Sequence, residues 1–287
     1  MKTFRDKRVL ITGAATGIGR LMSEAIAARG AEVFVTDVDA VRAEDVAMKL
    51  RAEGKRASAH VLDVTNLDQV QSLAREIGRI DALINNAGVV FGGTFGEVPL
   101  ERHLLTMRVN IEGLIALTHT FLPQLLRSSD GHIVNIASAS GYIGLPYGAS
   151  YAASKWAVIG FSESLRLELR LQNAKNLAVT TVCPGYIGTG MFSGARAPFV
   201  MPLLAPEVIC AKIVAGIERN EAFVKEPAIV KTLDLLRGVT PRVLFDRAAD
   251  ILGISSSMKA WKGHAAEATK SSNGSNHVSV DTSHSLT

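Results

Sequence analysis

The chain contains 287 residues, of which 47% are hydrophobic and 20% charged, so it can bury one sizeable core. Its net charge of +4 at pH 7 is not gathered in a basic run interleaved with aromatic residues, and we therefore expect no nucleic-acid partner. Its two cysteines and seven histidines show no metal-ligand spacing, so we expect no metal site. Because the first residues lead into a strand without an apolar signal region, we expect a cytoplasmic protein.

A glycine-rich turn follows the first predicted strand. Residues 9–11 form a short apolar run, and the turn after it contains Gly13, Gly17 and Gly19. Good helix formers without a breaker occupy residues 20–29, which predicts a helix directly after the turn. Glycines in this setting let the backbone approach a pyrophosphate, whose charge is favourable at a helix N-terminus.

The second predicted strand ends at an acidic residue. Gly30 is a helix-stop signal, and residues 32–36 form an apolar run that ends at Asp37. An acidic residue at the end of the second strand is placed to bind the ribose hydroxyls of a dinucleotide. The glycine turn and Asp37 together predict a dinucleotide site.

Further short apolar runs alternate with helix-like stretches along the chain. They lie at residues 82–84, 133–136 and 179–183. Strands that alternate with helices favour a mostly parallel sheet covered on both faces. The predicted fold class is α/β, a doubly wound, Rossmann-like parallel sheet in one domain, with residues 1–226 as the dinucleotide-binding part.

Tyr151 and Lys155 are predicted to lie one turn apart on the same face of a helix over residues 151–170. A tyrosine acts as an acid or base near neutral pH only if nearby positive charge lowers its pKa, and we expect the Lys155 ammonium to favour the phenolate. Ser138 is the candidate for polarising a carbonyl, with Ser140 as the alternative. A surface tyrosine and lysine at a common helical spacing is the other interpretation.

Five motifs, in the proper order, resemble those of the short-chain dehydrogenase/reductase family over residues 5–225. They are the T-G-x-x-x-G-x-G fingerprint, the N-N-A-G element, an asparagine, a serine with Y-x-x-x-K, and P-G-x-I-x-T. In chain order the matching residues are Thr12, Gly13, Gly17, Gly19, Asn85, Asn86, Ala87, Gly88, Asn110, Ser138, Tyr151, Lys155, Pro184, Ile187 and Thr189.

The resemblance implies a role for each part of the site. The catalytic residues would be Asn110, Ser138, Tyr151 and Lys155, with Asn110 positioning a water that leads to Lys155. The family also adds a seventh strand, for which residues 222–224 are the candidate. The cofactor-binding set would be Gly13, Thr16, Gly17, Ile18, Gly19, Asp37, Asp63, Val64, Asn86, Ala87, Gly88, Tyr151, Lys155, Pro184, Ile187 and Thr189.

The expected cofactor is NAD. Asp37 would repel the 2′-phosphate of NADP, and residues 14–16 contain no Arg or Lys to compensate. Arg42, the nearest downstream cation, is expected to be solvated on the following helix. The expected reaction is hydride transfer between a nicotinamide and a carbinol carbon. A non-catalytic NAD-binding sensor or scaffold is the alternative, as is a ketone or hydroxyacyl reductase working in the reductive direction.

The expected substrate is a lipophilic alcohol or carbonyl compound. Apolar residues follow Ser138 (Tyr142, Ile143, Leu145, Tyr147) and follow Thr189 (Met191, Phe192, Phe199, Val200, Met201, Leu203, Leu204), and such a lining suits an apolar ligand. Simple packing of these residues on the core is the alternative. The string over 189–192 is similar to that of the retinol and hydroxysteroid dehydrogenase branch, whereas Arg196 leaves a carboxylate-bearing substrate open.

The remaining expectations concern assembly and the end of the chain. Helices over residues 100–125 and 151–170 have apolar residues on more than one side, namely Leu114, Leu117, Phe121, Phe161 and Leu165, and a homo-oligomer, tetramer or dimer, is expected. Residues 227–262 predict an amphipathic helical extension broken near Pro241. It would pack on the domain, close over the substrate pocket or contact a membrane surface. Residues 263–287 are polar and expected to be disordered.

Overall fold

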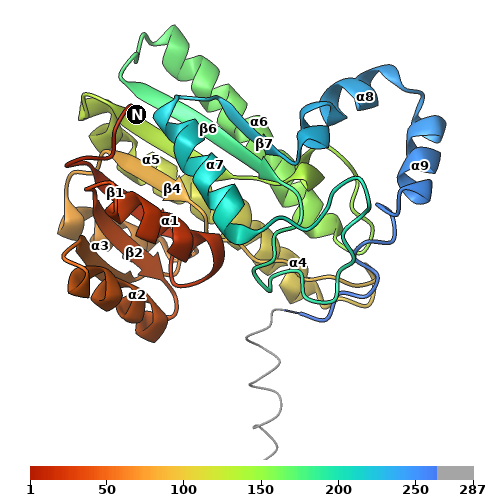
Figure 1. The fold of residues 1–287 in the computed structure, drawn as a ribbon, viewed down its shortest axis with the longest axis horizontal. Helices are drawn as coiled ribbons and strands as arrows, with labels where there is room; N and C mark the ends of the chain where they lie inside the picture. The colour runs from red at the N-terminus through yellow and green to blue at the C-terminus, as the bar shows by residue number, and fades with distance from the viewer. Residues whose placement is uncertain (264–287) are drawn as a thin grey trace, which may run out of the picture.

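The computed structural model describes residues 1–263, which form a seven-stranded sheet with helices on both faces (Figure 1). The strand order is β3-β2-β1-β4-β5-β6-β7, and every neighbouring pair is parallel. The predicted doubly wound α/β sheet is therefore confirmed. The strands are β1 (Arg8–Thr12), β2 (Glu32–Asp37), β3 (Arg56–Val61), β4 (Ala82–Asn85), β5 (Gly131–Ile136), β6 (Leu177–Pro184) and β7 (Phe223–Glu226).

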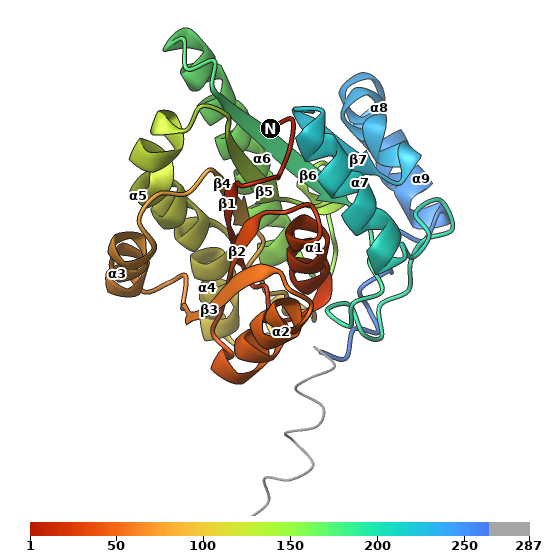
Figure 2. The same cartoon turned by 60° about the vertical axis from the view of Figure 1, so that its left-hand side comes forward.

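The helices fall into two layers because alternate strand residues point to opposite faces. Val9 and Ile11 of β1 face the core under α1 (Gly17–Ala27), α2 (Ala40–Ala52) and α7 (Pro206–Glu218), whereas Leu10 faces the other core. That second core lies under α3 (Leu67–Ile77), α5 (Gly113–Arg127) and α6 (Ala149–Leu171). Figure 2 shows the two layers on opposite sides of the sheet. The apolar runs in the sequence are thus strands buried on both faces.

Element boundaries differ from the sequence expectations in three places. The first helix begins at Gly17, inside the glycine turn, and ends at Ala27. The seventh strand is Phe223–Glu226, which is longer than the expected 222–224. The helix expected over 100–125 is α4 (Leu100–Met107), a π-helical turn (Arg108–Glu112) and α5. The π-turn contains Asn110, one of the expected catalytic residues.

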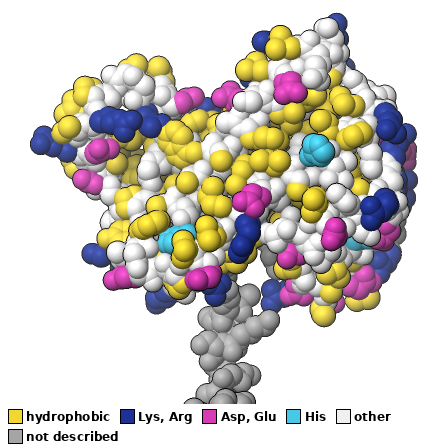
Figure 3. Space-filling model, turned by 180° about the vertical axis from the view of Figure 1, so that it is seen from behind, with side chains coloured by type: hydrophobic (Ala, Val, Ile, Leu, Met, Phe, Trp, Pro, Cys, Tyr) yellow, Lys and Arg dark blue, Asp and Glu magenta, His cyan; other side chains and the backbone are white. Residues whose placement is uncertain are grey.

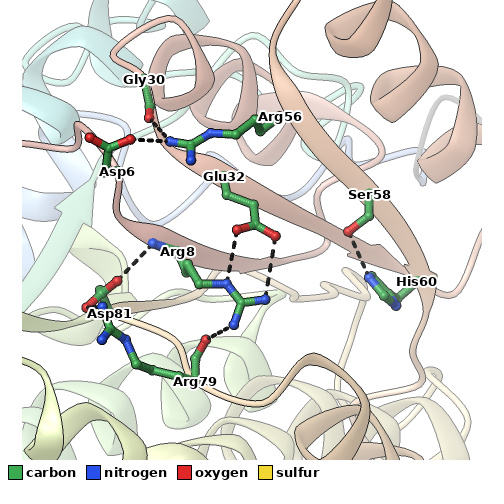
Figure 4. Close-up of polar contacts among 9 residues, drawn as sticks. All are labelled: Asp6, Arg8, Gly30, Glu32, Arg56, Ser58, His60, Arg79 and Asp81. Carbon is green, nitrogen blue, oxygen red and sulfur yellow. Dashed lines mark hydrogen bonds and ion pairs between the residues drawn. The ribbon is translucent and has the colours of Figure 1, made fainter.

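Polar contacts tie the strands together at their amino ends (Figure 4). Arg8 donates to Glu32 Oε2 through Nε at 3.0 Å and to Asp81 Oδ2 through its backbone N–H at 3.0 Å. Arg56 donates to Asp6 at 2.9 Å and to the Gly30 carbonyl at 2.7 Å. These contacts fix the amino ends of β1 to β4. The carboxyl ends, where ligands of open α/β sheets bind, carry the glycine turn and Asp37.

The expected oligomer residues do not form an open surface. Leu114, Leu117 and Phe121 are buried in the domain core, and Phe161 and Leu165 are half-buried against it. Their apolar character therefore reflects packing on the sheet, which corrects the expectation for these five residues. Other apolar residues of the same helices are exposed, namely Leu100, Leu104, Ile115, Leu126, Trp156, Leu167 and Leu171.

The C-terminal extension has two short helices that project from the domain (Figure 1). After a 3₁₀ turn (Ala228–Lys231), α8 (Leu233–Val239) and α9 (Arg242–Ile251) are separated at Pro241. Helix α9 contacts the core only through the half-buried Phe245 and Ala249, and Val243 and Ile251 are 64% and 85% exposed. Packing on the domain therefore accounts for only part of its apolar surface. Figure 3 shows apolar and basic side chains together on this lobe.

Residues 252–263 return to the domain in turns rather than in a helix. Ile254 and Met258 are buried, Trp261 Nε1 donates to the Met191 carbonyl at 3.1 Å, and Gly263 forms a β-bridge with Ser193. The tail expected to be disordered lies, beyond Gly263, outside the described residues. Within residues 1–263 no helix combines the length and apolar character needed to cross a bilayer.

Candidate active site

A cleft of about 530 Å³ opens at the carboxyl ends of the strands. It brings together the residues expected to bind the cofactor and the expected catalytic residues Ser138, Tyr151 and Lys155, from seven separate segments of the chain. Those that line it are Gly13, Thr16, Gly17, Ile18, Gly19, Asp37, Asp63, Val64, Asn86, Ala87, Gly88, Ser138, Tyr151, Lys155, Pro184, Ile187 and Thr189. Asn110 alone of the expected site residues does not line the cleft.

The glycine turn is locked onto the segment after β4. Asn86 Nδ2 donates to the carbonyls of Thr12 at 2.8 Å and Gly13 at 2.9 Å, and Thr12 Oγ1 accepts the backbone N–H groups of Asn86 and Ala87. Gly13 has φ +60°, and a Cβ on Gly19 would lie 2.2 Å from the Gly13 carbonyl oxygen. The two motifs therefore form one rigid unit that admits no side chain at these positions.

This unit fits a dinucleotide pyrophosphate. Thr16 precedes α1 in an extended conformation, and its side chain makes no capping hydrogen bond. The first N–H groups of α1 therefore remain available beside the glycine cradle, where the helix dipole favours an anion. The donor set and the lack of side chains at the cradle match the ligand that the sequence predicts.

Asp37 is held at the cleft edge by two backbone donors. Ala15 N–H donates to Oδ2 at 3.0 Å and Asp39 N–H donates to Oδ1 at 3.1 Å. Arg42 lines the same cleft, and its Nε lies 3.4 Å from an Asp39 carboxylate oxygen. Arg42 thus lies exposed on α2, as expected, and also reaches the edge of the cleft, where its charge is shared with Asp39. Val38 and Leu62 also line this end, and no sequence motif pointed to them.

Tyr151 and Lys155 are both buried on one face of α6. The hydroxyl of Ser138 hydrogen-bonds to Tyr151, which selects Ser138 over Ser140 as the partner of the proton donor. Lys155 Nζ donates to the Ile136 carbonyl at 2.7 Å and lies 5.6 Å from the centroid of the Tyr151 ring. The three side chains thus meet at the carboxyl end of β5, which excludes the surface interpretation.

Burial, and not the neighbouring ammonium, dominates the protonation of this pair. Burial raises the pKa of Tyr151 above its ordinary value, although the Ser138 hydrogen bond partly offsets this effect. Burial also lowers the pKa of Lys155 to about 8. Desolvation thus disfavours the charged form of both groups, and the expectation that the Lys155 ammonium favours the phenolate stays a prediction.

Asn110 lies behind the cleft and joins two elements of the site. Its Oδ1 accepts the Val89 N–H at 2.8 Å, and its Nδ2 donates to the Val89 carbonyl at 2.9 Å and to Ser154 Oγ at 3.0 Å. The side chain therefore fixes the segment after the N-N-A-G element to α6. Asn110 lies in the π-turn Arg108–Glu112, a helix irregularity that is frequent at functional sites.

A second, smaller cavity of about 30 Å³ adjoins the cleft at Tyr151. Four residues line both spaces, namely Ser138, Tyr151, Gly185 and Phe192, so the hydroxyls of Ser138 and Tyr151 stand at their junction. Most of the cavity wall is apolar. Its remaining lining residues are Ala139, Ser140, Ile143, Leu145, Tyr186, Met201, Ile254 and Ser257.

The cavity differs from the expected lining in part. Four of the expected residues line the cavity, namely Ile143, Leu145, Phe192 and Met201. Tyr142 instead contacts Cys183, and the side chains of Phe199 and Leu203 are exposed to solvent. Arg196 is not among the lining residues. Sequence reasoning missed Tyr186, Ile254 and Ser257, since a distant C-terminal segment supplies the last two. Cys183 is buried, and burial raises the pKa of its thiol to about 12, so it is an inert core residue.

A family model described as "short chain dehydrogenase" matches residues 7–198. The chain belongs to the short-chain dehydrogenase/reductase family. Two curated relatives cover most of it. Mouse "Epidermal retinol dehydrogenase 2" is 32% identical over 269 residues, 91% of this chain and 87% of that protein. Human "Estradiol 17-beta-dehydrogenase 11" is 30% identical over 244 residues, 84% and 81% of the two chains.

Solved structures of short-chain dehydrogenases superimpose on the same fold. One from Burkholderia phymatum, in complex with NAD, has a TM-score of 0.75 and 28% identity, covering 83% of this chain and 95% of that one. One from Burkholderia cenocepacia, in complex with NADP, has a TM-score of 0.74 and 28% identity, covering 85% and 98%. This short-chain dehydrogenase/reductase is therefore an NAD(P)-dependent oxidoreductase that acts on CH–OH donors.

Proposed function

We propose that this enzyme interconverts a lipophilic alcohol and its carbonyl compound with NAD as the cofactor. The observation that carries the proposal is the mostly apolar cavity that meets the cofactor cleft at Ser138 and Tyr151. An apolar cavity with a few convergent hydroxyls selects an apolar ligand and orients its one reacting oxygen. The similarity to proteins named retinol and estradiol dehydrogenases supports the same class of substrate.

Each catalytic side chain has a separate task in this proposal. Tyr151 accepts the carbinol proton during oxidation and returns it during reduction. Ser138, bonded to Tyr151, donates to the same substrate oxygen as charge develops on it. Lys155 supplies a cation beside Tyr151 and the cofactor ribose. A nicotinamide held in the cleft would supply the hydride chemistry, and its oxidised form would add positive charge that favours the phenolate of Tyr151.

The preference for NAD rests on Asp37. Its carboxylate is fixed by two backbone N–H groups, so it cannot turn away from a ligand at the cleft edge without losing both hydrogen bonds. A fixed carboxylate accepts ribose hydroxyls and repels a 2′-phosphate. Arg42 at the edge of the cleft would favour NADP, and its ion pair with Asp39 weakens that effect.

An activity screen with both cofactors tests the proposal. We expect turnover with NAD on aliphatic, retinoid, steroid, aromatic or hydroxyacyl alcohols, and a higher kcat/KM with NAD than with NADP. A preference for small charged alcohols would contradict the substrate class, and an advantage of NADP would contradict the cofactor. Cofactor binding without turnover on any alcohol or carbonyl would instead favour a sensor or scaffold.

We further propose that α8 and α9 contact a membrane surface from which lipophilic substrates arrive. Their exposed apolar residues are Leu235, Leu236, Val239, Val243, Leu244, Ile251 and Leu252, and Lys231, Arg242 and Arg247 stand beside them. Apolar side chains with basic neighbours bind anionic bilayer interfaces. Sedimentation with phosphatidylglycerol vesicles, lost on replacing Val243 and Ile251 by Asp, tests this contact. If the wild-type protein stayed entirely in the supernatant when such vesicles were sedimented, the proposed membrane contact would be contradicted.

We also propose that the enzyme is a homo-oligomer and that it is located in the cytoplasm. The exposed apolar residues of α4, α5 and α6 support a homodimer or tetramer in which these helices meet. Light scattering at micromolar concentration would contradict an oligomer by giving a monomeric mass. A cytoplasmic location is tested by fractionation of cells that express the full chain.

A further inference from the structure

One hydroxyl in the substrate cavity has no partner within the described residues. Five hydroxyl side chains line the cavity, and four of them form two pairs. Ser138 bonds Tyr151, and Tyr186 donates to Ser257 Oγ at 2.8 Å. The fifth is Ser140, whose Oγ is buried and makes no hydrogen bond to any residue that the structure describes.

The position of Ser140 is fixed by the backbone. It lies in the 3₁₀ turn Ala139–Gly141, is 6% exposed, and its own N–H donates to Ser138 Oγ at 3.2 Å. Burying a hydroxyl without a hydrogen bond is unfavourable, and such groups are rare in native proteins. An alanine would avoid this cost. The Ser140 hydroxyl has almost no accessible surface as it stands, so the serine is explained best if its side chain turns into the cavity and bonds a ligand there.

The other residues that line the cavity indicate the chemical class of that ligand. Apolar surface is all that four of the lining residues offer, namely Ile143, Leu145, Met201 and Ile254. The hydroxyls of Tyr186 and Ser257 already have protein partners, because Tyr186 donates to Ser257 Oγ, which in turn donates to the Ile254 carbonyl at 2.7 Å. A serine hydroxyl both donates and accepts, so it pairs with a neutral oxygen equally well as a hydroxyl or a ketone. Among residues 1–263 no charged side chain lines the cavity to hold a carboxylate.

We propose that Ser140 is a specificity-determining residue whose hydroxyl bonds a second oxygen of the substrate. The proposal rests on the proposed function and names its substrate class more closely. The preferred substrate is a lipophilic alcohol with a further hydroxyl or keto oxygen a few bonds from the reacting carbon. This second oxygen must lie close to the reacting oxygen, because the two serine hydroxyls are close to each other. The Ser140 backbone nitrogen donates to Ser138 Oγ, and only three bonds separate that nitrogen from Ser140 Oγ.

The test compares three probes in the wild type and in Ser140→Ala. The probes are a secondary octanol, the corresponding vicinal diol, and the diol with one carbon between its two carbinols, each oxidised with saturating cofactor. We expect the wild type to favour a diol over the mono-alcohol. Ser140→Ala should lower the ratio of kcat/KM for that diol to kcat/KM for the mono-alcohol by roughly 5- to 15-fold, the effect of one neutral hydrogen bond.

Ser257→Ala is the matched control, because it removes a hydroxyl that already has protein partners. It should leave the ratio near the wild-type value but lower the melting temperature. Ser140→Ala should not lower the melting temperature, since no hydrogen bond within the described protein is lost. A clear loss of stability in Ser140→Ala would show that its hydroxyl serves the fold, and would overturn the proposal.

The kinetic outcomes separate this proposal from the function on which it rests. A wild type that oxidises the mono-alcohol but prefers neither diol overturns the role of Ser140 and leaves the enzyme class intact. An equal fall for all probes in Ser140→Ala also overturns it, because the residue then only positions Ser138. A wild type that oxidises none of the three probes contradicts the proposed function, and this inference with it.

Discussion

Replacing Lys155 by Met should slow alcohol oxidation in a way that depends on pH. Lys155 Nζ lies 5.6 Å from the centroid of the Tyr151 ring, over which a phenolate spreads its charge. With an effective dielectric constant of about 20, Coulomb's law gives an attraction of roughly 3 kcal/mol at that separation, which corresponds to about 100-fold in the phenolate population. Oxidation needs the phenolate, and burial already raises the pKa of Tyr151. Losing the cation therefore lowers the rate by about this factor.

The sign of the pH dependence follows from Lys155 itself. Burial lowers the pKa of Lys155 to about 8, so the wild type has the stabilising cation below that pH and loses it above. The ratio of wild-type to Lys155→Met rates should be largest below pH 8 and shrink as the pH rises further. The measurement is kcat with saturating alcohol and cofactor across this range, with cofactor affinity determined separately by fluorescence titration.

Lys155→Arg provides the control, because arginine keeps its charge throughout this range. Its rate relative to Lys155→Met should not shrink above pH 8. A wild-type to Lys155→Met ratio that is constant with pH would refute an electrostatic role. It would leave Lys155 as a group that only holds the Ile136 carbonyl and the cofactor.

Three further predictions concern the proton donor, the glycine turn and the end of the chain. Tyr151→Phe should lower turnover by about 10² or more while calorimetry still detects cofactor binding, because only the transferable proton is lost; near-normal turnover would remove Tyr151 from the mechanism. Gly19→Ala should abolish cofactor binding, since its Cβ would lie 2.2 Å from the Gly13 oxygen, whereas Gly160→Ala, with nothing within 4 Å, should bind normally. A chain that ends after Gly263 should keep its melting temperature and KM. A chain that ends after Leu252 loses the buried Ile254 and Met258, so it should melt at a lower temperature and bind substrate less well. Equal tolerance of both truncations would contradict a role for residues 253–263.

The local motifs of the sequence were enough for the dinucleotide half of the site. Short apolar runs predict strands, glycines predict the turn, and Asp37 follows its strand directly. Because parallel strands place their carboxyl ends at one edge, residues after separate strands converge there whatever the details of packing. The cofactor residues from Gly13 to Thr189 therefore line one cleft, as local sequence order implies.

The substrate side depended on contacts between segments far apart in the chain. No local pattern shows that Ile254 and Ser257 return from beyond α9 to the catalytic cavity, or that Tyr186 bonds Ser257. Nor does spacing alone show that Ser140 Oγ lacks a partner, because that depends on which side chains are near it in space.

The sequence by itself determined the residue types and the order in which strands, turns and helices present them, because periodicity and turn chemistry act over a few neighbouring residues. Only the tertiary structure decided the protonation of the catalytic pair. Tyr151 and Lys155 are one helical turn apart in any helix, but their pKa values are set by desolvation, which depends on everything packed around them. Packing likewise decided that Leu117 and Phe121 of α5 are core residues, whereas Val243 and Ile251 of α9 are on the surface.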